Sequence, residues 1–325
     1  MTKLMIKNKV AIPVMRSDER KYITYDVVNG VATKQNITEW KLPGNVTDVA
    51  DYGLYYLQAY NENLTQANLS SLTTITGNYG LASEFSNCTN LVSADLSNLT
   101  AITGNYACSS IFANCSKLIS IDLSELVSIT GNYVFQQAFY QDSLVSVDFS
   151  SLTTVNGNNV FQQAFGCPVI SFPSLVSANS NCFYRMGYAN TNLISVDLTA
   201  LTTATGTGTF QQAFMNCTKL TSINLNNLKT INSANNSNCF NQMCSGCTTL
   251  TSMRFPKITS SDVSITGTTA ATNPFYQCFY KCIGMTELHF HSSMSTYSSY
   301  LTKTVLFGGT TTTYCNANLQ ILFDL

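Results

Sequence analysis

Aspartate recurs at one position in successive segments of this 325-residue chain and is the first candidate for a chemical role. Asp95, Asp122, Asp148 and Asp197 each stand four residues after a leucine, and Asn224 holds the same place in the following segment. On adjacent parallel strands about 4.8 Å apart, such side chains would form one outward row. Like charges directly opposite each other destabilise a sheet mildly, so we expect something to compensate them.

Two interpretations of the aspartate row remain open. In the first, the row is a ligand-binding surface that holds a cation or the basic or hydroxyl groups of a partner. In the second, the carboxylates are solvated or hydrogen-bonded by the nearby Ser97, Ser124 and Ser150, at a cost below about 1 kcal/mol per pair of like charges.

The other reactive residues do not predict a catalytic centre. Acyl transfer needs a base beside serine or cysteine, and the chain has only two histidines, His289 and His291, which flank Phe290. These two could share a strand face and bind a metal ion, but no further histidine and few acids lie near them. We therefore expect no enzyme activity, no metal and no cofactor. Glycan hydrolysis by the aspartate row is the weakest alternative, because an open face has no cleft to raise the pKa of one carboxyl.

The twelve cysteines are spaced like packing residues rather than like a disulfide framework. Six of them are expected in one slot just before the next repeat begins, where a free cysteine packs as a small hydrophobic residue: Cys88, Cys115, Cys167, Cys217, Cys247 and Cys282. Cys244-Ser245-Gly246-Cys247 has the spacing of a redox motif but lacks the pattern that surrounds such motifs.

The elements that would position these residues are tandem repeats. The repeats can be aligned on Leu64, Leu91, Leu118, Leu144, Val169, Leu193, Leu220, Leu250 and Met285. The steps between these anchors are mostly 24 to 30 residues, which is the range of leucine-rich repeats. Aligned in this way, the outward position four residues after the anchor is Pro173 in the fifth repeat. The chain is therefore predicted to be a solenoid of roughly eight coils.

Each column of the repeat has a predicted structural role. Apolar residues three and five positions after the anchor indicate a short parallel strand, and those at eight and eleven indicate a later turn into the same interior. The Gly-Asn pair that follows in several repeats predicts a sharp turn in left-handed conformation. The motif Phe-Gln-Gln-Ala-Phe at 135–139, 161–165 and 210–214 predicts a short helix or 3₁₀ turn with both rings on one face. The fold class is thus an α/β repeat solenoid.

These residues resemble the BspA-like leucine-rich repeat family. The resemblance is carried by segments such as Phe85-Ser86-Asn87-Cys88-Thr89-Asn90-Leu91 and Phe214-Met215-Asn216-Cys217-Thr218-Lys219-Leu220, and it covers about residues 61 to 290. It implies an extracellular or surface-displayed recognition solenoid of bacteria, their phages or mucosal protists. The chain differs from the family in carrying aspartate at the strand position where threonine is common.

Composition divides the chain into three parts and limits its partners. Charged residues make up 10% of the chain, against about 25% in an average protein, with 16 basic and 17 acidic side chains. We therefore expect no nucleic-acid partner and, without a long apolar run, no membrane insertion. Residues 1–60 are expected to be an attachment and capping segment that contacts other subunits, residues 61–290 the solenoid, and residues 291–325 a C-terminal cap. Tyr52, Tyr55, Tyr56 and Tyr60 fit a capping role or ligand binding equally well.

The predicted function is a non-enzymatic binding or structural protein. The N-terminal segment shows no signal peptide, which favours a phage virion component, in the tail or on the capsid surface, that recognises a host protein or glycan. The alternative is a bacterial cell-surface adhesin whose leader lies outside this sequence. In both cases we expect the solenoid to be displayed on a virion surface or outside the cell.

Overall fold

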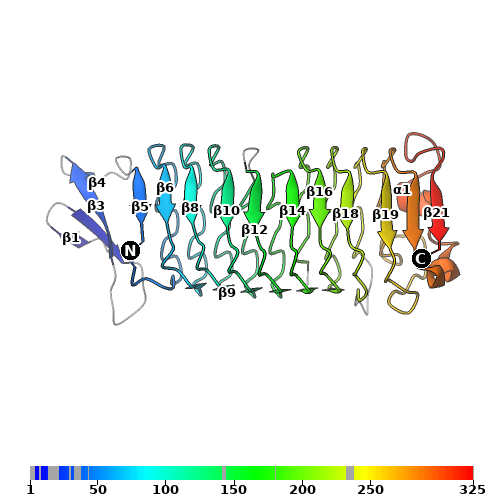
Figure 1. Cartoon of the computed structure of the whole chain (residues 1–325), viewed down its shortest axis with the longest axis horizontal. Helices are drawn as coiled ribbons and strands as arrows, with labels where there is room; N and C mark the ends of the chain where they lie inside the picture. The colour runs from blue at the N-terminus through cyan, green and yellow to red at the C-terminus, as the bar shows by residue number, and fades with distance from the viewer. Residues whose placement is uncertain are drawn as a thin grey trace.

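The chain forms an elongated solenoid in which short strands lie side by side along the long axis (Figure 1). The structure is a computed structural model of the whole chain. It describes residues 38–324 apart from 43, 141–143, 180 and 232–237, and before residue 38 it describes four strands.

The four N-terminal strands form an antiparallel sheet in the order β1-β2-β3-β4. They are β1 (Leu4–Ile6), β2 (Lys9–Pro13), β3 (Tyr22–Val28) and β4 (Val31–Ala32). The fold does not test the attachment role predicted for residues 1–60, part of which lies outside the described residues, and this role remains a prediction.

One strand from each coil joins a parallel sheet on what we call the front of the solenoid. Its strands are β5 (Glu39–Lys41), β6 (Gln66–Asn68), β8 (Ser93–Asp95), β10 (Ser120–Asp122), β12 (Ser146–Asp148), β14 (Val169–Ser171), β16 (Ser195–Asp197), β18 (Ser222–Asn224), β19 (Ser252–Phe255), β20 (Glu287–Phe290) and β21 (Gln320–Phe323). Hydrogen bonding divides them into three groups, with breaks after β12 and after β18. The middle residue of most of these strands points into the core, as the predicted alternation requires.

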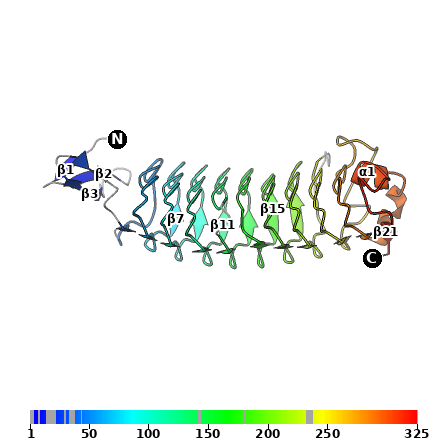
Figure 2. The same cartoon turned by 90° about the horizontal axis from the view of Figure 1, so that it is seen from above.

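A second parallel sheet lies on the side of the solenoid and is seen from above in Figure 2. It contains β7 (Thr74–Ile75), β9 (Ala101–Ile102), β11 (Ser128–Ile129), β13 (Thr154–Val155), β15 (Ser177–Asn179) and β17 (Thr203–Thr205). Its buried residues are those predicted eleven positions after the anchor, such as Ile102 and Ile129. One coil cannot bury them alone, so neighbouring coils stabilise each other.

The structure corrects the alignment of the fifth coil. Val169 pairs with Ser195, whereas the sequence alignment placed it opposite Leu193. The anchor slot is therefore filled by Cys167, and the outward residue of this coil is Ser171 rather than Pro173. Cys167 consequently does not belong to the slot before the anchor. The error arose because the true anchor is a cysteine, whereas the aliphatic Val169 stands two residues later and resembles an anchor.

The back of each coil is a run of turns and not the predicted helical segment. Alternate amides bond within the coil to the carbonyl three residues earlier, as Ala82 does to Tyr79, and the others bond to the next coil, as Leu81 does to Ala107. Every fourth residue has a positive φ, as at Gln137 and Tyr133. A period of four brings both rings of Phe-Gln-Gln-Ala-Phe to one face without a helix.

The Gly-Asn pairs have different roles from those predicted. Gly77, Gly104 and Gly131 do not have positive φ; the left-handed residue is the tyrosine two positions later. Each glycine instead lies against the backbone of the preceding coil, where a Cβ atom would overlap it. The asparagines form a ladder: Asn105 Oδ1 accepts a hydrogen bond from the Asn132 amide at 2.9 Å. Both residues therefore serve the stacking of coils.

Phenylalanine fills the interior in two stacked columns, as the sequence predicts. Successive rings have centroids 5.0 to 6.5 Å apart, and the columns are Phe85, Phe112, Phe139, Phe165 and Phe135, Phe161, Phe183, Phe210, Phe240, Phe275. Because each buried ring removes about 150–250 Å² from water, these columns dominate the apolar stabilisation of the rod.

The C-terminal end keeps the parallel register while its turns become helical. The 3₁₀ helix η2 (Ser292–Tyr297) and the helix α1 (Lys303–Phe307) connect β20 to β21. Parallel pairing reaches from β5 to β21, although with breaks, so the coil pattern begins before residue 61 and continues past residue 290. The predicted domain boundaries at 60 and 290 therefore do not coincide with the limits of coil pairing. Among the described residues, no helix is long and apolar enough to cross a lipid bilayer.

Candidate functional site

The aspartate row lies on the outward side of the front strands, which we call the front face. Asp122 pairs with Asp95 on one side and with Asp148 on the other, so these three side chains form the predicted row. Asp197 and Asn224 pair with each other in the next group of strands, and Ser171 pairs with Asp197. Asp122 and Asp148 are exposed, whereas the other three predicted site residues are half-buried.

Each carboxylate of the row closes a turn at the end of its strand. Oδ1 of Asp122 accepts the backbone N–H of Ser124 at 2.9 Å, and Oδ1 of Asp148 accepts that of Ser150 at 2.8 Å. Asp95 accepts both the amide and the hydroxyl of Ser97. The hydrogen-bonded alternative of the sequence analysis is therefore present for one oxygen of each of these carboxylates.

The turn requires an acceptor oxygen but not a negative charge. Asn68 accepts the Ser70 amide at 3.1 Å and Asn224 accepts the Asn226 amide at 3.2 Å in the same geometry. Asparagine thus closes this turn in the coils at both ends of the row. Four of the coils between Asn68 and Asn224 carry aspartate instead. Their like charges lie on neighbouring or nearby strands, and the need to close the turn does not explain why these residues are charged.

An exposed apolar column runs beside the aspartate row in the same coils. It occupies the position just before each strand, and its members are Val92, Ile119, Val145 and Ile194. In the fifth repeat Pro168 holds this position, and the exposed Val169 is the first residue of β14. Between 45% and 59% of each residue is accessible to solvent. Val145 N–H bonds to the Ile119 carbonyl at 2.8 Å, which places these two side chains on adjacent coils. Thr65 and Thr221 hold the same position at the two ends, so the apolar column is confined to the central coils.

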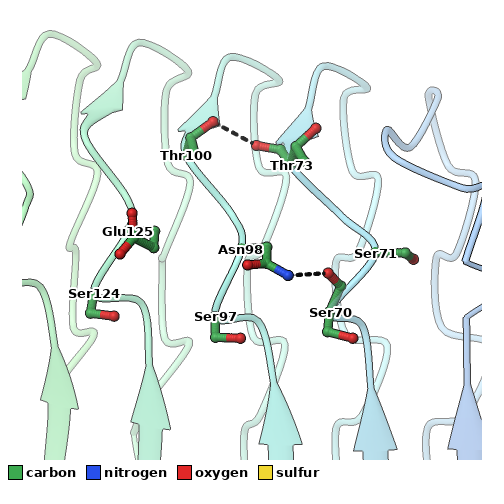
Figure 3. Close-up of a pocket in the computed structure, with 8 residues that line it drawn as sticks. All are labelled: Ser70, Ser71, Thr73, Ser97, Asn98, Thr100, Ser124 and Glu125. Atoms are coloured by element: carbon green, nitrogen blue, oxygen red, sulfur yellow. Dashed lines mark hydrogen bonds between the residues drawn. The ribbon is translucent and has the colours of Figure 1, made fainter.

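A shallow polar groove follows the ends of the front strands (Figure 3). Its lining is Ser70, Ser71, Thr73, Ser97, Asn98, Thr100, Ser124 and Glu125. Asn98 Nδ2 donates to the Ser70 carbonyl at 2.7 Å, and Thr100 Oγ1 donates to the Thr73 carbonyl at 2.9 Å. Side chains in this groove therefore connect neighbouring coils, and Glu125 is its one charged member.

The two histidines do not converge on a common site. His289 is buried on β20, where Nδ1 lies 2.9 Å from Asp324 Oδ1 and Nε2 lies 3.3 Å from Glu287 Oε2. His291 lies beyond the strand and accepts the Ser293 amide at the start of η2. In the part of the chain that the structure describes, no three histidine, cysteine, aspartate or glutamate side chains are grouped closely enough to hold a metal ion.

The cysteines are buried thiols inside the solenoid. Several of the slot cysteines donate S–H to a carbonyl of the preceding coil, as Cys115 does to Phe85 at 3.0 Å and Cys247 to Phe214 at 3.0 Å. Burial raises the pKa of Cys244, in the Cys-x-x-Cys segment, to about 12. A thiol with so high a pKa supplies little nucleophilic thiolate near neutral pH.

Sequence reasoning identified the aspartate row but missed the apolar column. The residues of this column stand between two buried positions, the anchor and the middle of the strand, so that their apolar character looks like part of the core. The available signal was the replacement by threonine at both ends, at Thr65 and Thr221.

The fold and its repeated surface define a leucine-rich repeat solenoid. The family model described as "BspA type Leucine rich repeat region" matches in six copies, over residues 32–137, 82–212, 136–261 and 211–306. The chain belongs to this family. Its members are repeat proteins, and the role expected from this membership is binding or structural rather than enzymatic.

Three solved structures show similarity to the chain. A leucine-rich repeat protein of T. pallidum is 21% identical with a TM-score of 0.39, over 56% of this chain and 78% of that one. A leucine-rich cell surface protein of Faecalibacterium prausnitzii is 15% identical with a TM-score of 0.31, over 99% and 94%. A leucine-rich repeat protein of Bacteroides ovatus is 15% identical with a TM-score of 0.32, over 98% and 90%. No curated protein has significant similarity to the chain.

Proposed function

We propose that this protein is a displayed, non-enzymatic binding protein that holds a partner against the front face of its central coils. The observation that carries the proposal is that the surplus aspartates and the exposed apolar column occupy the same coils. Charge that the turns do not need and apolar surface that the core does not need are both typical of an interaction site.

The geometry of the front face supports a partner of stated chemistry. The apolar column and the aspartate row are three residues apart along the strand, which is about 10 Å. In the column and in the row alike, successive side chains belong to successive coils along the long axis of the solenoid. A protein segment that carries an apolar row flanked by lysine or arginine fits this surface. Its apolar row would cover the apolar column, and its basic side chains would pair with the aspartate row.

A peptide library displayed on yeast and selected against the full chain tests this proposal. We expect enriched peptides to combine aliphatic residues with lysine or arginine. Their binding should weaken at least tenfold in Asp122→Asn/Asp148→Asn and in Ile119→Ser/Val145→Ser. Peptides without basic residues, or binding that neither double variant alters, would refute it.

The display part of the proposal has two forms. The chain is either a phage virion component, in the tail or on the capsid surface, or an adhesin on a bacterial cell. Family membership supports a binding solenoid in both. Mass spectrometry of purified phage particles and of cell-surface fractions from the source distinguishes them, and absence of the chain from both would refute display.

The remaining alternative, glycan hydrolysis, is tested by incubating the chain with cell-wall and plant polysaccharides. We expect no release of reducing ends. Turnover that disappears in Asp122→Asn would establish an enzyme and overturn the proposal.

A further inference from the structure

Glutamine side chains form a ladder along the back of the solenoid, which we call the glutamine ladder. Its members occupy a left-handed backbone position in their coils, and each amide donates towards the next coil. Gln137 Nε2 donates to Gln163 Oε1 at 3.4 Å. Further along, Gln212 Nε2 donates to Gln242 Oε1 at 2.8 Å, and Gln242 Nε2 to Gln277 Oε1 at 3.1 Å. Glutamine suits this position because its amide is both a donor and an acceptor, so that it can bond to the coils on both sides.

Arg185 interrupts the glutamine ladder in the fifth coil. Its backbone has the same left-handed conformation, with φ of 54°, and its Nε donates to Gln212 Oε1 at 2.7 Å, so the ladder continues on that side. On the other side the ladder ends, because arginine has no acceptor for the Nε2 amide of Gln163. In the described part of the chain that amide has no hydrogen-bond partner. Stacking of the coils therefore favours glutamine at position 185 and does not explain arginine.

Two tyrosines of the same coil hold the guanidinium of Arg185. Its central carbon, Cζ, lies 5.1 Å from the ring centroid of Tyr184 and 5.1 Å from that of Tyr188. Cation–π contact with both rings and the hydrogen bond to Gln212 restrict the side chain, so the guanidinium is pre-organised. The two adjacent coils have no tyrosine at these positions, where they carry Gln162, Gly166, Gln211 and Met215.

The Nη nitrogens of Arg185 have no acceptor, and its charge has no counter-ion, among the residues that the structure describes. The back turns of this coil and of the two coils on each side contain no aspartate or glutamate over residues 134–140, 160–167, 182–190, 210–217 and 240–247. The side chain is half-buried, so salt screens its charge less than that of a fully exposed residue. Arg185 is therefore a fixed cation among neutral amides, with donors directed to an anion from outside the chain.

We propose that Arg185 binds the carboxylate of an acidic sugar on the back of the solenoid. The two Nη nitrogens of a guanidinium can bond to both oxygens of a carboxylate, and a single cation balances the single charge of that group. A phosphate monoester carries close to two charges at neutral pH, and an acidic peptide carries several, so one arginine balances either only in part.

Neutral polar groups beside Arg185 suit the hydroxyl groups that surround a sugar carboxylate. The Nε2 amide of Gln163, which the interrupted ladder leaves without an acceptor, belongs to the adjacent coil. The hydroxyl groups of Tyr184 and Tyr188 make no hydrogen bond within the described part of the chain, and a phenol hydroxyl both donates and accepts. This site lies on the opposite side of the coils from the front strands and does not depend on the function proposed for the front face.

Calorimetric titration and saturation-transfer NMR on the full chain test the proposal with trigalacturonate and sialyllactose, two sources of a sugar carboxylate. Maltotriose and lactose are their neutral counterparts. At low salt we expect millimolar or tighter binding of at least one acidic sugar and no binding of the neutral ones. The variant Arg185→Gln should weaken binding at least tenfold. Because glutamine completes the ladder between Gln163 and Gln212, the melting temperature of this variant should be unchanged or higher.

The matched control is Lys281→Gln, which removes a cation that lies over the Tyr280 ring further along the back and should leave binding unchanged. The proposal is overturned if neither acidic sugar binds at millimolar concentration, if the neutral sugars bind as tightly, or if Arg185→Gln binds as tightly as the unaltered chain. It is also overturned if inorganic phosphate or tetraglutamate binds through Arg185 and the acidic sugars do not. If no sugar binds and Arg185→Gln melts at a lower temperature, the contacts with Tyr184 and Tyr188 serve stability alone.

Discussion

Gly131 lies directly against the carbonyl oxygen of Gly104 in the preceding coil, with no room for a Cβ atom between them. Gly157 meets Gly131 in the same way, and Gly104 meets Gly77. The column of glycines is therefore a line along which backbones of successive coils approach most closely, and the approach holds the Asn105 and Asn132 ladder in hydrogen-bonding range.

Gly131→Ala is expected to destabilise the solenoid by overpacking. The added methyl group meets backbone atoms, which cannot move aside as a side chain can, so we expect a loss of about 1–3 kcal/mol or more. Urea denaturation followed by circular dichroism measures it. Gly44→Ala is the control, because a Cβ atom at Gly44 meets nothing within 4 Å. Equal stability of the two variants would refute the close approach.

Two substitutions distinguish the role of Asp122 as a hydrogen-bond acceptor in the turn from the role of its negative charge. Asp122→Asn keeps the acceptor for the Ser124 amide and removes a like charge beside Asp95 and Asp148, so the free energy of unfolding should change by less than about 0.5 kcal/mol. Asp122→Ala removes the acceptor and should cost about 1 kcal/mol. Chemical denaturation at low salt compares the two. If asparagine is as damaging as alanine, the charge itself is structural.

The buried thiols make stability fall at high pH. Burial raises the pKa of Cys244 and Cys282 to about 12 from the ordinary value of 9.0. A raised pKa in the folded state means that the stability is complete below pH 9, where thiols of the unfolded chain are protonated, and is lost as pH rises from 9 towards 12. The urea midpoint should therefore decrease between pH 8 and pH 11.

Tyrosine and lysine side chains in general also titrate in this range, so a comparison with a variant that lacks these two thiols is needed. The variant Cys244→Ala/Cys282→Ala should show a shallower decrease than the unaltered chain. In parallel, iodoacetamide should modify these two thiols only after unfolding. Rapid alkylation of the native chain at pH 8 would show that they are accessible.

The repeated columns could be predicted from the sequence because burial repeats with the coil. Leu126 and Ile129 lie in the core as their spacing requires, and so do the stacked rings of Phe135 and Phe161. Spacing alone misplaced the fifth coil, because Cys167 fills an anchor slot and Val169 imitates one. Cysteine and valine are both common in a core, so spacing alone did not show that cysteine replaces the aliphatic anchor in this repeat.

Conformation was harder to predict than burial. A helix and a chain of turns with a period of four both place Phe135 and Phe139 on one face. The positive φ of Gln137 and the hydrogen bond from its amide to the next coil distinguish the two. Glycine likewise serves either a left-handed turn or a close contact, and Gly131 serves the second. Of the two features of the front face, the aspartate row was predicted, because the charge of Asp122 marks an outward position. The apolar column was missed, because Ile119 resembles a core residue.

Phe161→Ala is expected to weaken the middle of the rod far more than its ends. The ring is fully buried between Phe135 at 5.9 Å and Phe183 at 6.1 Å, so its loss should cost about 3–5 kcal/mol. Because each coil contacts only its neighbours, hydrogen exchange should accelerate most in the third to fifth repeats, counted from the anchor Leu64, and less in β20 and β21. Phe323→Ala, which removes a partly buried ring stacked on Phe290, is the control and should affect only the C-terminal strands. Acceleration spread evenly over the chain in both variants would mean that the coils unfold as one cooperative unit.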